Sequence, residues 1–357
     1  MKKGANKVEL VLAFDGALQL YDLPYSVRVK YQKDIYDDVN IESGRITISY
    51  CRSSSAKKGR AFNKTRITYV QSIILALSSS DACAHVLGLE SALYSLNDGE
   101  AEELRLPDGL DNLKLDWRGV RFPTKAVKRS LGNDWVANSI SIAISYCWAA
   151  ARTFSQEERL KLLWGSFNAL YRGYARLKKP DAKRLSEQDA LDLMNGLLVG
   201  NSVLKQALQV FYEEIEPIGY KEFVQWKILT SPRSGSLYVK PDSDLPKEKG
   251  RRLALLDTET LENMRDCGCK NYKTKANLRR AVENQISNSK CETEPNRKVA
   301  MLLCRYIYIF RCEGVHAETV YPVFRTNGNN EKRVLADLLE AAVVDLADWF
   351  SENIAMG

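Results

Sequence analysis

One arginine and one histidine lie at a spacing that suits phosphate chemistry. The chain has only two histidines in 357 residues, and His316 lies five positions after Arg311, behind the apolar aromatic run RYIYIF. Histidine carries protons near neutral pH, and arginine binds two phosphate oxygens at once. Arg311 and His316 are therefore candidate catalytic residues. Glu313, between them, either orients His316 or serves as a solvated cap.

Local geometry leaves two interpretations of this pair open. Five residues along an ideal helix rotate a side chain by about 140°, so Arg311 and His316 would not share one face of a straight helix. Gly314 lies between them and favours a helix end or a bend, after which both side chains could converge on one cleft. In the structural alternative, Arg311 caps the helix carboxyl end and His316 fills the following loop.

The elements that must position the pair are helical from about residue 138 to the end. Ser155 is a good N-cap, with Glu158 completing a capping box, and apolar residues then recur at steps of three and four. Further helices are predicted at 139–154, 186–215, 251–266, 275–288, 296–316 and 334–350. Residues 231–250 are rich in Pro, Ser and Gly and predict an irregular insertion. No fixed repeat occurs, so a helical bundle is expected.

The first third of the chain has a different pattern. Alternating or β-branched runs predict strands at 8–14, 26–32 and 45–51, the first of them buried. The Ala- and Leu-rich stretch 68–96 predicts one or two helices, and 106–123 a turn and a short strand. His85 lies on an apolar stretch and is predicted to pack in a core. The fold class is therefore α+β: a mixed α/β domain over 1–137, then a mainly helical domain over 138–357.

Composition indicates a soluble globular protein with a mild basic excess. The chain has 52 Lys and Arg against 45 Asp and Glu, a net charge of +7. No window has the uncharged apolar length that a membrane span needs, and the N-terminal segment lacks the features of a signal peptide. We therefore expect a cytoplasmic protein with no membrane association.

The eight cysteines fit a reducing compartment. Five are predicted to be reduced core thiols: Cys51, Cys83, Cys147, Cys304 and Cys312. Cys267 and Cys269 form a C-x-C pair, with Cys291 further on, which supplies only part of a zinc site. A turn carrying two thiols is favoured over metal binding, and no metal or cofactor is expected.

Two segments concentrate basic residues. The first comprises Arg265, Lys270, Lys273, Lys275, Arg279 and Arg280, and the second Arg121, Lys125, Lys128 and Arg129. A single run of this kind is usually a solvated helix face. If it borders a site, it can bind nucleic-acid phosphates, so Lys270, Lys273, Lys275, Arg279 and Arg280 are candidate RNA-binding residues.

Taken together, these features resemble the HEPN superfamily of helical bundles, many of which are metal-independent ribonucleases marked by Arg-x4-6-His. Tyr308, Arg311, Cys312 and His316 match the pattern Tyr-x-x-Arg-Cys-x-x-x-His of one bacterial branch, and Leu163–Tyr171 resembles its first helix. The likeness covers roughly 138–357. It departs at Cys312, where many relatives have a small polar residue, and at Ala317, where glycine is frequent.

The resemblance implies an endoribonuclease that cleaves RNA by attack of the 2′-hydroxyl without a metal, with Arg311 and His316 catalytic and Tyr308 and Glu313 supporting. It implies a homodimer, or a partner that brings a second motif copy, because each chain has one motif. It also implies a toxin or antiviral defence role, with an antitoxin or defence-system partner. Two other hypotheses stay open: a non-catalytic HEPN-like module for RNA binding or protein docking, and a DNA-binding or regulatory protein.

Overall fold

The computed structural model describes residues 6–14, 24–32, 35–52, 61–83, 87–111, 114–181, 185–219, 223, 295–308 and 326–354. The chain divides into two compact units, the first formed by 1–180 with 346–357 and the second by 181–345. The domain boundary expected at residue 137 falls inside helix α4 (Trp135–Ala150), which packs within the first unit. The insertion expected at 231–250 lies outside the described residues.

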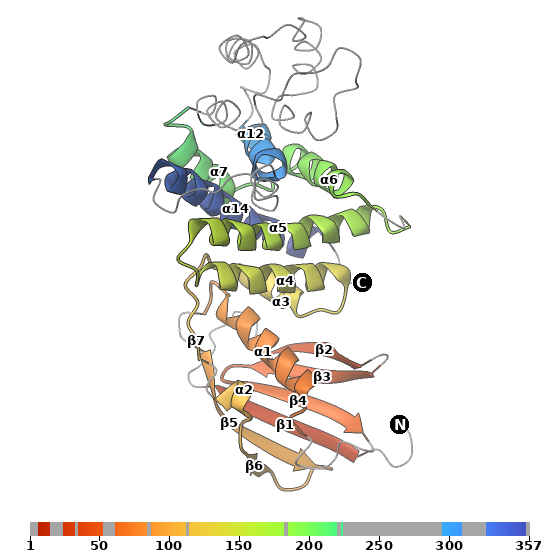
Figure 1. Ribbon diagram of the computed structural model, residues 1–357. Coiled ribbons are helices and arrows are strands. Elements are labelled where there is room, and N and C mark those ends of the chain that lie inside the picture. The colour runs from red at the N-terminus through yellow and green to blue at the C-terminus, as the bar shows by residue number, and fades with distance from the viewer. Residues whose placement is uncertain are drawn as a thin grey trace, which may run out of the picture. The chain divides into compact units, whose positions relative to one another are not determined.

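The first unit is built on an antiparallel sheet of order β2-β3-β4-β1-β5-β6, with β7 paired to β5 (Figure 1). The strands are β1 (Asn6–Phe14), β2 (Tyr25–Gln32), β3 (Ile35–Glu42), β4 (Arg45–Arg52), β5 (Leu87–Leu96), β6 (Glu102–Leu104) and β7 (Lys114–Leu115). The three strands expected from the sequence are therefore present as β1, β2 and β4.

Strand β1 differs from the expectation of a strand buried on both faces. Val8, Leu10 and Leu12 are fully buried, whereas Glu9 and Val11 between them are partly exposed. β1 lies between β4 and β5, and alternate side chains of a strand point to opposite faces. The continuous apolar run therefore encodes one buried face, and the other face stays accessible.

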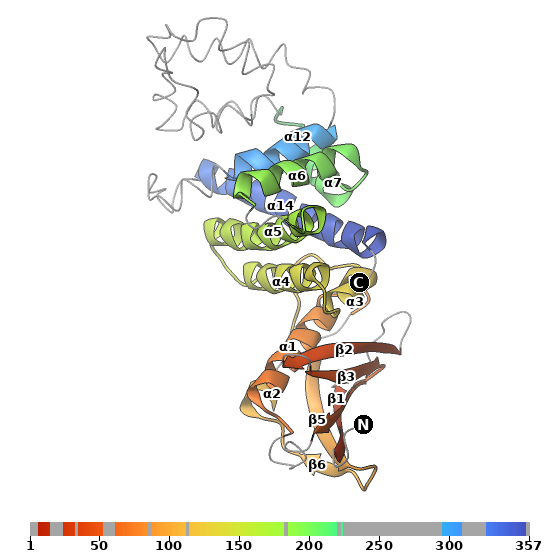
Figure 2. The same ribbon diagram turned by 90° about the vertical axis from the view of Figure 1, so that its right-hand side faces the viewer.

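Two helices lie on the same side of the sheet (Figure 2). They are α1 (Lys64–Ser78) and α2 (Asp108–Asp111), and the Gln71 side-chain amide of α1 donates to the Gly109 carbonyl of α2 at 2.8 Å. Asn63 caps α1 by accepting a hydrogen bond from the Arg66 backbone N–H. Val70, Ile73, Ile74 and Leu77 form the buried face of α1, and this spacing fits a helix packed on one side.

The prediction of one or two helices over 68–96 is correct for α1 and wrong for Leu87–Leu96, which forms β5. This strand pairs with β1, for example Tyr94 opposite Leu10, and with β6. Its Ala- and Leu-rich composition favours a helix locally, but pairing on both sides overrides that preference. The turn expected at Pro107–Gly109 leads into the single helical turn α2, and the short strand expected after it is β7.

A fully buried ion pair joins α1 to the sheet. Arg66 Nε lies 3.1 Å from Asp37 Oδ2 on β3, and both side chains are wholly inaccessible. Arg66 Nη1 donates to the Ala61 carbonyl at 2.9 Å, and its guanidinium lies 3.5 Å from the Tyr50 ring centroid on β4. The Tyr69 hydroxyl donates to the same Asp37 oxygen at 2.9 Å, and burial raises the pKa of Tyr69 above its ordinary value. These contacts offset the cost of burying two charges.

We predict that Arg66→Met lowers the free energy of unfolding by about 3–5 kcal/mol, because it leaves the Asp37 carboxylate buried and unpaired. Urea unfolding followed by circular dichroism measures this. Arg28→Gln is the matched control: it breaks an exposed Arg–Asp pair between neighbouring strands (Arg28 Nε–Asp38 Oδ1, 3.1 Å), which is expected to change stability by less than about 1 kcal/mol. Equal losses of stability in the two variants would refute the stabilising role of the buried Arg66–Asp37 pair.

A helical hairpin completes the first unit together with α3 (Thr124–Ser130). It consists of α4 and α5 (Gln156–Lys178), and Asp134 caps α4 by accepting from the Val136 and Ala137 N–H groups. The capping box expected at Ser155 is half formed. Ser155 accepts from the Glu158 N–H, but the Glu158 carboxylate accepts from the Thr153 hydroxyl instead of from the Ser155 N–H. The complete capping box in the described helices is that of Ser186 and Asp189 on α6.

The second unit is helical. Its described elements are α6 (Glu187–Gly200), α7 (Gln206–Val210), the π-helical turn η2 (Phe211–Ile215), α12 (Pro295–Met301), the π-helical turn η6 (Leu302–Tyr306) and most of α14 (Thr326–Asn353). The buried Asp345 of α14 caps α7 by accepting from the backbone N–H groups of Lys205, Gln206 and Ala207 at 2.8–3.1 Å. Burial raises the pKa of Asp345, and these three hydrogen bonds oppose that shift.

The α+β class expected from the sequence is confirmed, with the antiparallel sheet in the N-terminal part and helices after it. Among the described residues, no helix is long and apolar enough to cross a membrane.

Candidate functional site

Most of the predicted site residues lie outside the described part of the chain. These are Arg311, Glu313, His316, Lys270, Lys273, Lys275, Arg279 and Arg280, together with Cys312 and the thiols Cys267, Cys269 and Cys291. His85, expected to be a core residue, also lies outside it. Tyr308 is described, and it is the last described residue before the Arg–His motif.

The helix that leads to the motif is a core element of the second unit. It starts at Pro295, passes through the π-helical turn η6 and continues to Tyr308. Val299, Ala300, Leu302, Leu303 and Cys304 are fully buried. A helix that is apolar on most sides belongs in a core, so the predicted role of the aromatic run in the bundle interior agrees with its burial.

A π-helical turn lies close before the motif. In η6 the Ile307 N–H donates to the Leu302 carbonyl, five residues back. Such a turn inserts an extra residue into the helix and redirects the side chains that follow, and it is frequent at functional sites.

The Tyr306 hydroxyl fixes this helix to α14. Its oxygen lies 2.7 Å from Glu331 Oε1 and 3.4 Å from the Phe223 carbonyl oxygen, and its ring contacts the Phe223 ring. Tyr306 is 1% exposed. Sequence reasoning took Tyr306 only as one member of an apolar run. The hydroxyl of a buried tyrosine needs a hydrogen-bond partner, so a tyrosine within an apolar run is the sequence feature that could have indicated this contact.

A second polar cluster of the second unit also involves α14. Arg333 of α14 binds both carboxylate oxygens of Glu214 from η2, at 3.1 and 2.9 Å, and Asp337 at 2.9 Å. Hydrogen bonding to Arg333 lowers the pKa of Glu214, and hydrogen bonding to Glu214 raises the pKa of Arg333. All three side chains are partly exposed and form ion pairs with one another. This cluster is therefore a surface ion-pair contact between η2 and α14.

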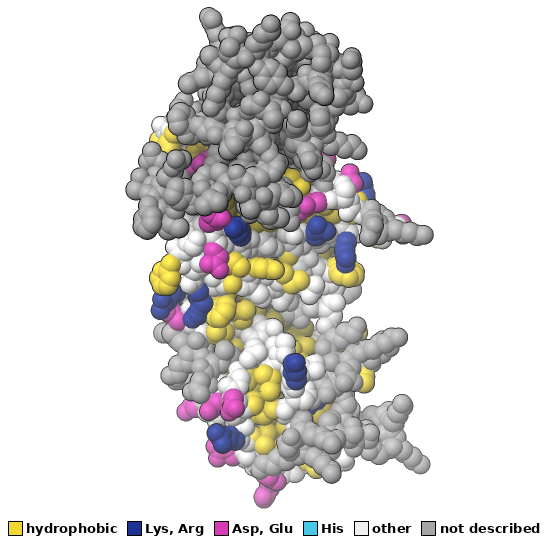
Figure 3. All heavy atoms as spheres, in the orientation of Figure 1, with side chains coloured by type: hydrophobic (Ala, Val, Ile, Leu, Met, Phe, Trp, Pro, Cys, Tyr) yellow, Lys and Arg dark blue, Asp and Glu magenta, His cyan; other side chains and the backbone are white. Residues whose placement is uncertain are grey.

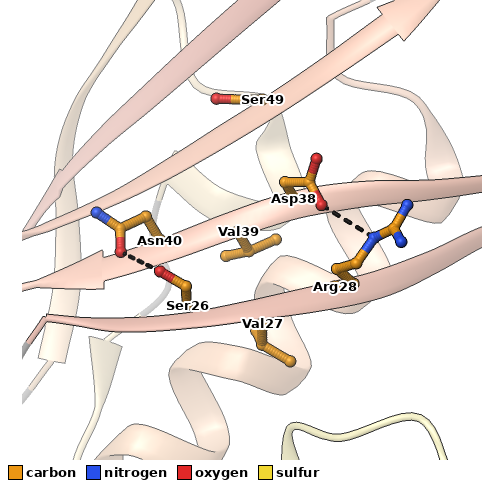
Figure 4. Close-up of a pocket in the computed structure, with 7 residues that line it drawn as sticks. All are labelled: Ser26, Val27, Arg28, Asp38, Val39, Asn40 and Ser49. Carbon is orange, nitrogen blue, oxygen red and sulfur yellow. Dashed lines mark hydrogen bonds and ion pairs between the residues drawn. The ribbon is translucent and has the colours of Figure 1, made fainter.

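The first unit has a shallow hollow of about 290 Å³ on the sheet face opposite α1 (Figure 4). Ser26, Arg28, Asp38, Asn40 and Ser49 supply its polar groups. The polar side chains bind each other: Arg28 pairs with Asp38, and the Ser26 hydroxyl donates to Asn40 Oδ1 at 2.9 Å. Cross-strand pairing of this kind stabilises the sheet and leaves no nucleophile with an adjacent base in the hollow.

In the part of the chain that the structure describes, no cluster of three or more His, Cys, Asp or Glu side chains that could hold a metal ion occurs. Cys83, Cys147 and Cys304 are buried and form no disulfide, as expected. Cys51 is exposed, which corrects its prediction as a core thiol: it lies at the end of β4 and points to the accessible face of the sheet. Of the second basic run, Arg129 is buried and pairs with Asp134 at 2.7 Å, a structural role.

Neither a protein-family model, nor a curated protein, nor a solved structure matches the chain. The HEPN resemblance therefore depends on the sequence features of this chain alone, the Arg–His motif and the helix Leu163–Tyr171 among them.

We predict that Tyr306→Phe lowers the free energy of unfolding by about 1 kcal/mol, since it removes a buried hydrogen bond and leaves Glu331 without that donor. Thermal unfolding of the full chain measures the change. Tyr212→Phe is the control, because Tyr212 on η2 is 46% exposed, whereas Tyr306 is buried. A loss in the control as large as in Tyr306→Phe would contradict the role given to Tyr306.

Proposed function

We propose that the protein is a HEPN-type, metal-independent endoribonuclease that acts as a toxin or anti-phage defence effector. The observation that carries the proposal is the sequence Tyr308-x-x-Arg311-Cys312-x-x-x-His316, which directly follows a buried helix of the helical unit. A rigid helix fixed by Tyr306 and Glu331 is a suitable support for catalytic side chains that follow it.

The proposed reaction begins with attack of a ribose 2′-hydroxyl on the adjacent phosphorus. The hydroxyl loses a proton to a base, the P–O5′ bond breaks, and the leaving 5′-oxygen receives a proton. The products are a 2′,3′-cyclic phosphate and a 5′-hydroxyl. His316 has the pKa range for proton transfer, and Arg311 stays protonated and stabilises the charge on the phosphorane. The reaction uses no metal ion and no organic cofactor.

The proton transfers need two groups on opposite sides of the phosphate. Each chain has one Arg311–His316 pair, so two chains meeting at the motif supply both groups most simply. A homodimer is therefore part of the proposal. The candidate phosphate contacts Lys270, Lys273, Lys275, Arg279 and Arg280 would then hold the RNA backbone, with little sequence preference.

A non-catalytic role is the second candidate. Cys312 stands where many relatives have a small polar residue directly after the arginine, and this departure allows an RNA-binding or protein-docking HEPN-like module. Such a module would retard RNA in a gel and leave it intact.

We predict that the purified protein cleaves RNA in the presence of EDTA and leaves 2′,3′-cyclic phosphate ends, and that His316→Ala abolishes cleavage. Positioned acid–base catalysis typically contributes about 10²–10⁴ in rate, so loss of the histidine should leave almost no activity. Gel analysis of cleaved RNA and mass spectrometry of its ends measure both results.

Circular dichroism and thermal unfolding serve as controls for His316→Ala, because a buried structural histidine would lower the melting temperature instead. Full activity in a well-folded His316→Ala protein would exclude the catalytic assignment. Cleavage that stops in EDTA and returns with magnesium or manganese would exclude the mechanism.

We also predict that the active species is a dimer. Sedimentation should give the mass of two chains, and specific activity should fall on dilution into the range where the dimer dissociates. Co-expressed Arg311→Ala and His316→Ala chains should still associate, because neither change removes the surrounding surface. A monomer with constant specific activity over a wide dilution range would refute the composite site.

A further inference from the structure

The outward face of the α4–α5 hairpin has an unusual composition. Helix α4 has sixteen residues without a single charged side chain, yet Trp135, Ile142 and Tyr146 are 61%, 38% and 42% exposed. Surface helices normally carry charges on their outer side. In Figure 3, hydrophobic side chains lie in a row over α4 and α5, with Lys and Arg side chains beside them. We call Trp135, Ile142, Tyr146, Arg172 and Arg176 the α4–α5 face.

These side chains form one continuous surface. Trp135, Ile142 and Tyr146 are spaced by seven and four residues, so they share one side of α4. Gly165, Arg172 and Arg176 have the same spacing on α5. The two rows touch at both ends: the Arg176 guanidinium lies 4.2 Å from the Trp135 ring centroid, and a Cβ on Gly165 would lie 2.9 Å from the Tyr146 ring.

The segment of the chain that forms the hairpin has a basic excess, and Arg172 and Arg176 are its members on the α4–α5 face. Between Trp135 and Pro180 the chain has seven basic residues against two acidic ones, an excess of five where the whole chain has +7. The basic residues are Arg152, Arg159, Lys161, Arg172, Arg176, Lys178 and Lys179, and the acidic ones are Glu157 and Glu158. Glu157 forms an ion pair with Lys161 at 2.8 Å. Both glutamates lie in the first turn of α5, at the other end of the helix from Arg172 and Arg176.

The two arginines of the face are available for anions. Arg172 Nε donates to the Asn168 side chain at 2.6 Å, and Arg176 lies over the Trp135 ring. In the described part of the chain, neither forms an ion pair with a carboxylate. A guanidinium on an aromatic ring is held in place while its N–H groups stay free for phosphate oxygens.

We propose that the α4–α5 face binds single-stranded RNA, with bases stacked on Trp135 and Tyr146 and phosphates bound by Arg172 and Arg176. Exposed aromatic rings beside arginines are the means by which proteins hold single strands without reading their sequence. Trp135 and Tyr146 are separated by eleven residues, about 16 Å along the helix. Rings at that distance suit splayed bases, whereas bases in a duplex are stacked inside it.

Protein docking explains the face less well. An interface with another protein is depleted of charge at its centre, whereas here the apolar row is one residue wide and bordered by unpaired cations. The choice of RNA over DNA rests on the proposed ribonuclease function. The proposal that the face binds a single strand depends only on its exposed rings and arginines.

The test is fluorescence anisotropy of a labelled 12-nucleotide RNA with the full chain carrying His316→Ala, which keeps the RNA intact. Trp135→Ala and Tyr146→Leu should each weaken binding by about 5-fold or more, the loss expected for one stacked base. Leucine at 146 keeps an apolar contact with Gly165. Arg172→Gln with Arg176→Gln should weaken binding and lower the slope of log affinity against log salt by about 1.4, or about 0.7 per lost phosphate contact.

Arg28 and Tyr36 supply the matched controls, because the Arg28 guanidinium also lies over an exposed aromatic ring, at 5.4 Å, but on the sheet. Tyr36→Ala and Arg28→Gln should leave RNA affinity within about twofold, since they lie outside the proposed contacts. Unchanged melting temperatures confirm that the variants are folded.

The outcomes separate this proposal from the ribonuclease proposal. If the wild-type chain leaves RNA intact but Trp135→Ala weakens binding, the ribonuclease proposal fails and the RNA-binding face stands. If the chain cleaves RNA but no change on the α4–α5 face affects binding, the face assignment fails alone. Tighter binding of a DNA strand of the same sequence would overturn the assignment to RNA. A dimer that Trp135→Ala dissociates, with RNA affinity unchanged, would show that a second copy covers the face.

Discussion

The first unit depends on one buried guanidinium. Arg66 enters the space between α1 and the sheet and is fully buried there. Its charge is offset by Asp37 at 3.1 Å, by the Ala61 carbonyl and by the Tyr50 ring. The same oxygen of Asp37 receives the Tyr69 hydroxyl, so two residues of α1 converge on one point of β3. Sliding α1 along the sheet would break all of these contacts at once, whereas apolar contacts alone would tolerate a shift. The ion pair therefore sets the position of α1.

Close helix packing in the hairpin has a direct consequence for its surface. Gly165 and Gly173 bring α5 so near to α4 that a side chain at either position would collide with Tyr146 or Ser139. With the two backbones this close, small residues of α4 such as Ser139 fill the contact, whereas Trp135 and part of the Tyr146 ring stay exposed at its edge. The exposed aromatic rings thus follow from the packing, and their arginine neighbours come from the facing edge of α5. One local arrangement gives both the rigidity and the chemistry of the α4–α5 face.

In the second unit, hydrogen bonds and ion pairs at helix ends and turns fix the positions of the helices in an apolar bundle. Asp345 satisfies the first N–H groups of α7, Arg333 joins α14 to η2, and Tyr306 joins the helix before the motif to α14. All three ties involve α14, so that helix organises the described part of the unit. A support of this kind limits the motion of the segment leading to Arg311. Pre-organised supports of catalytic groups require such restraint, which connects the fold to the proposed ribonuclease function.

The sequence by itself determined the elements whose patterns are local. The strands β2 and β4 follow from alternation, and β1 follows from a continuous β-branched run. Helices α5 and α14 follow from their apolar patterns, and the α+β class follows from the order of these elements. The Arg311–His316 motif is also local, and the hypothesis of RNA cleavage comes from those residues and from a resemblance. No fold was needed to state it, and the described residues do not include it.

Only the tertiary structure decided the features that depend on distant partners. Leu87–Leu96 is a strand because β1 lies beside it, although its composition favours a helix. The pairing of Arg66 with Asp37 joins positions 29 residues apart, and the contact of Trp135 with Arg176 joins two helices. Periodicity reports which side of an element is buried, but it carries no information about which other element lies there. Burial, pairing and exposed faces are properties of two elements together, and for that reason they appear only when the chain is folded.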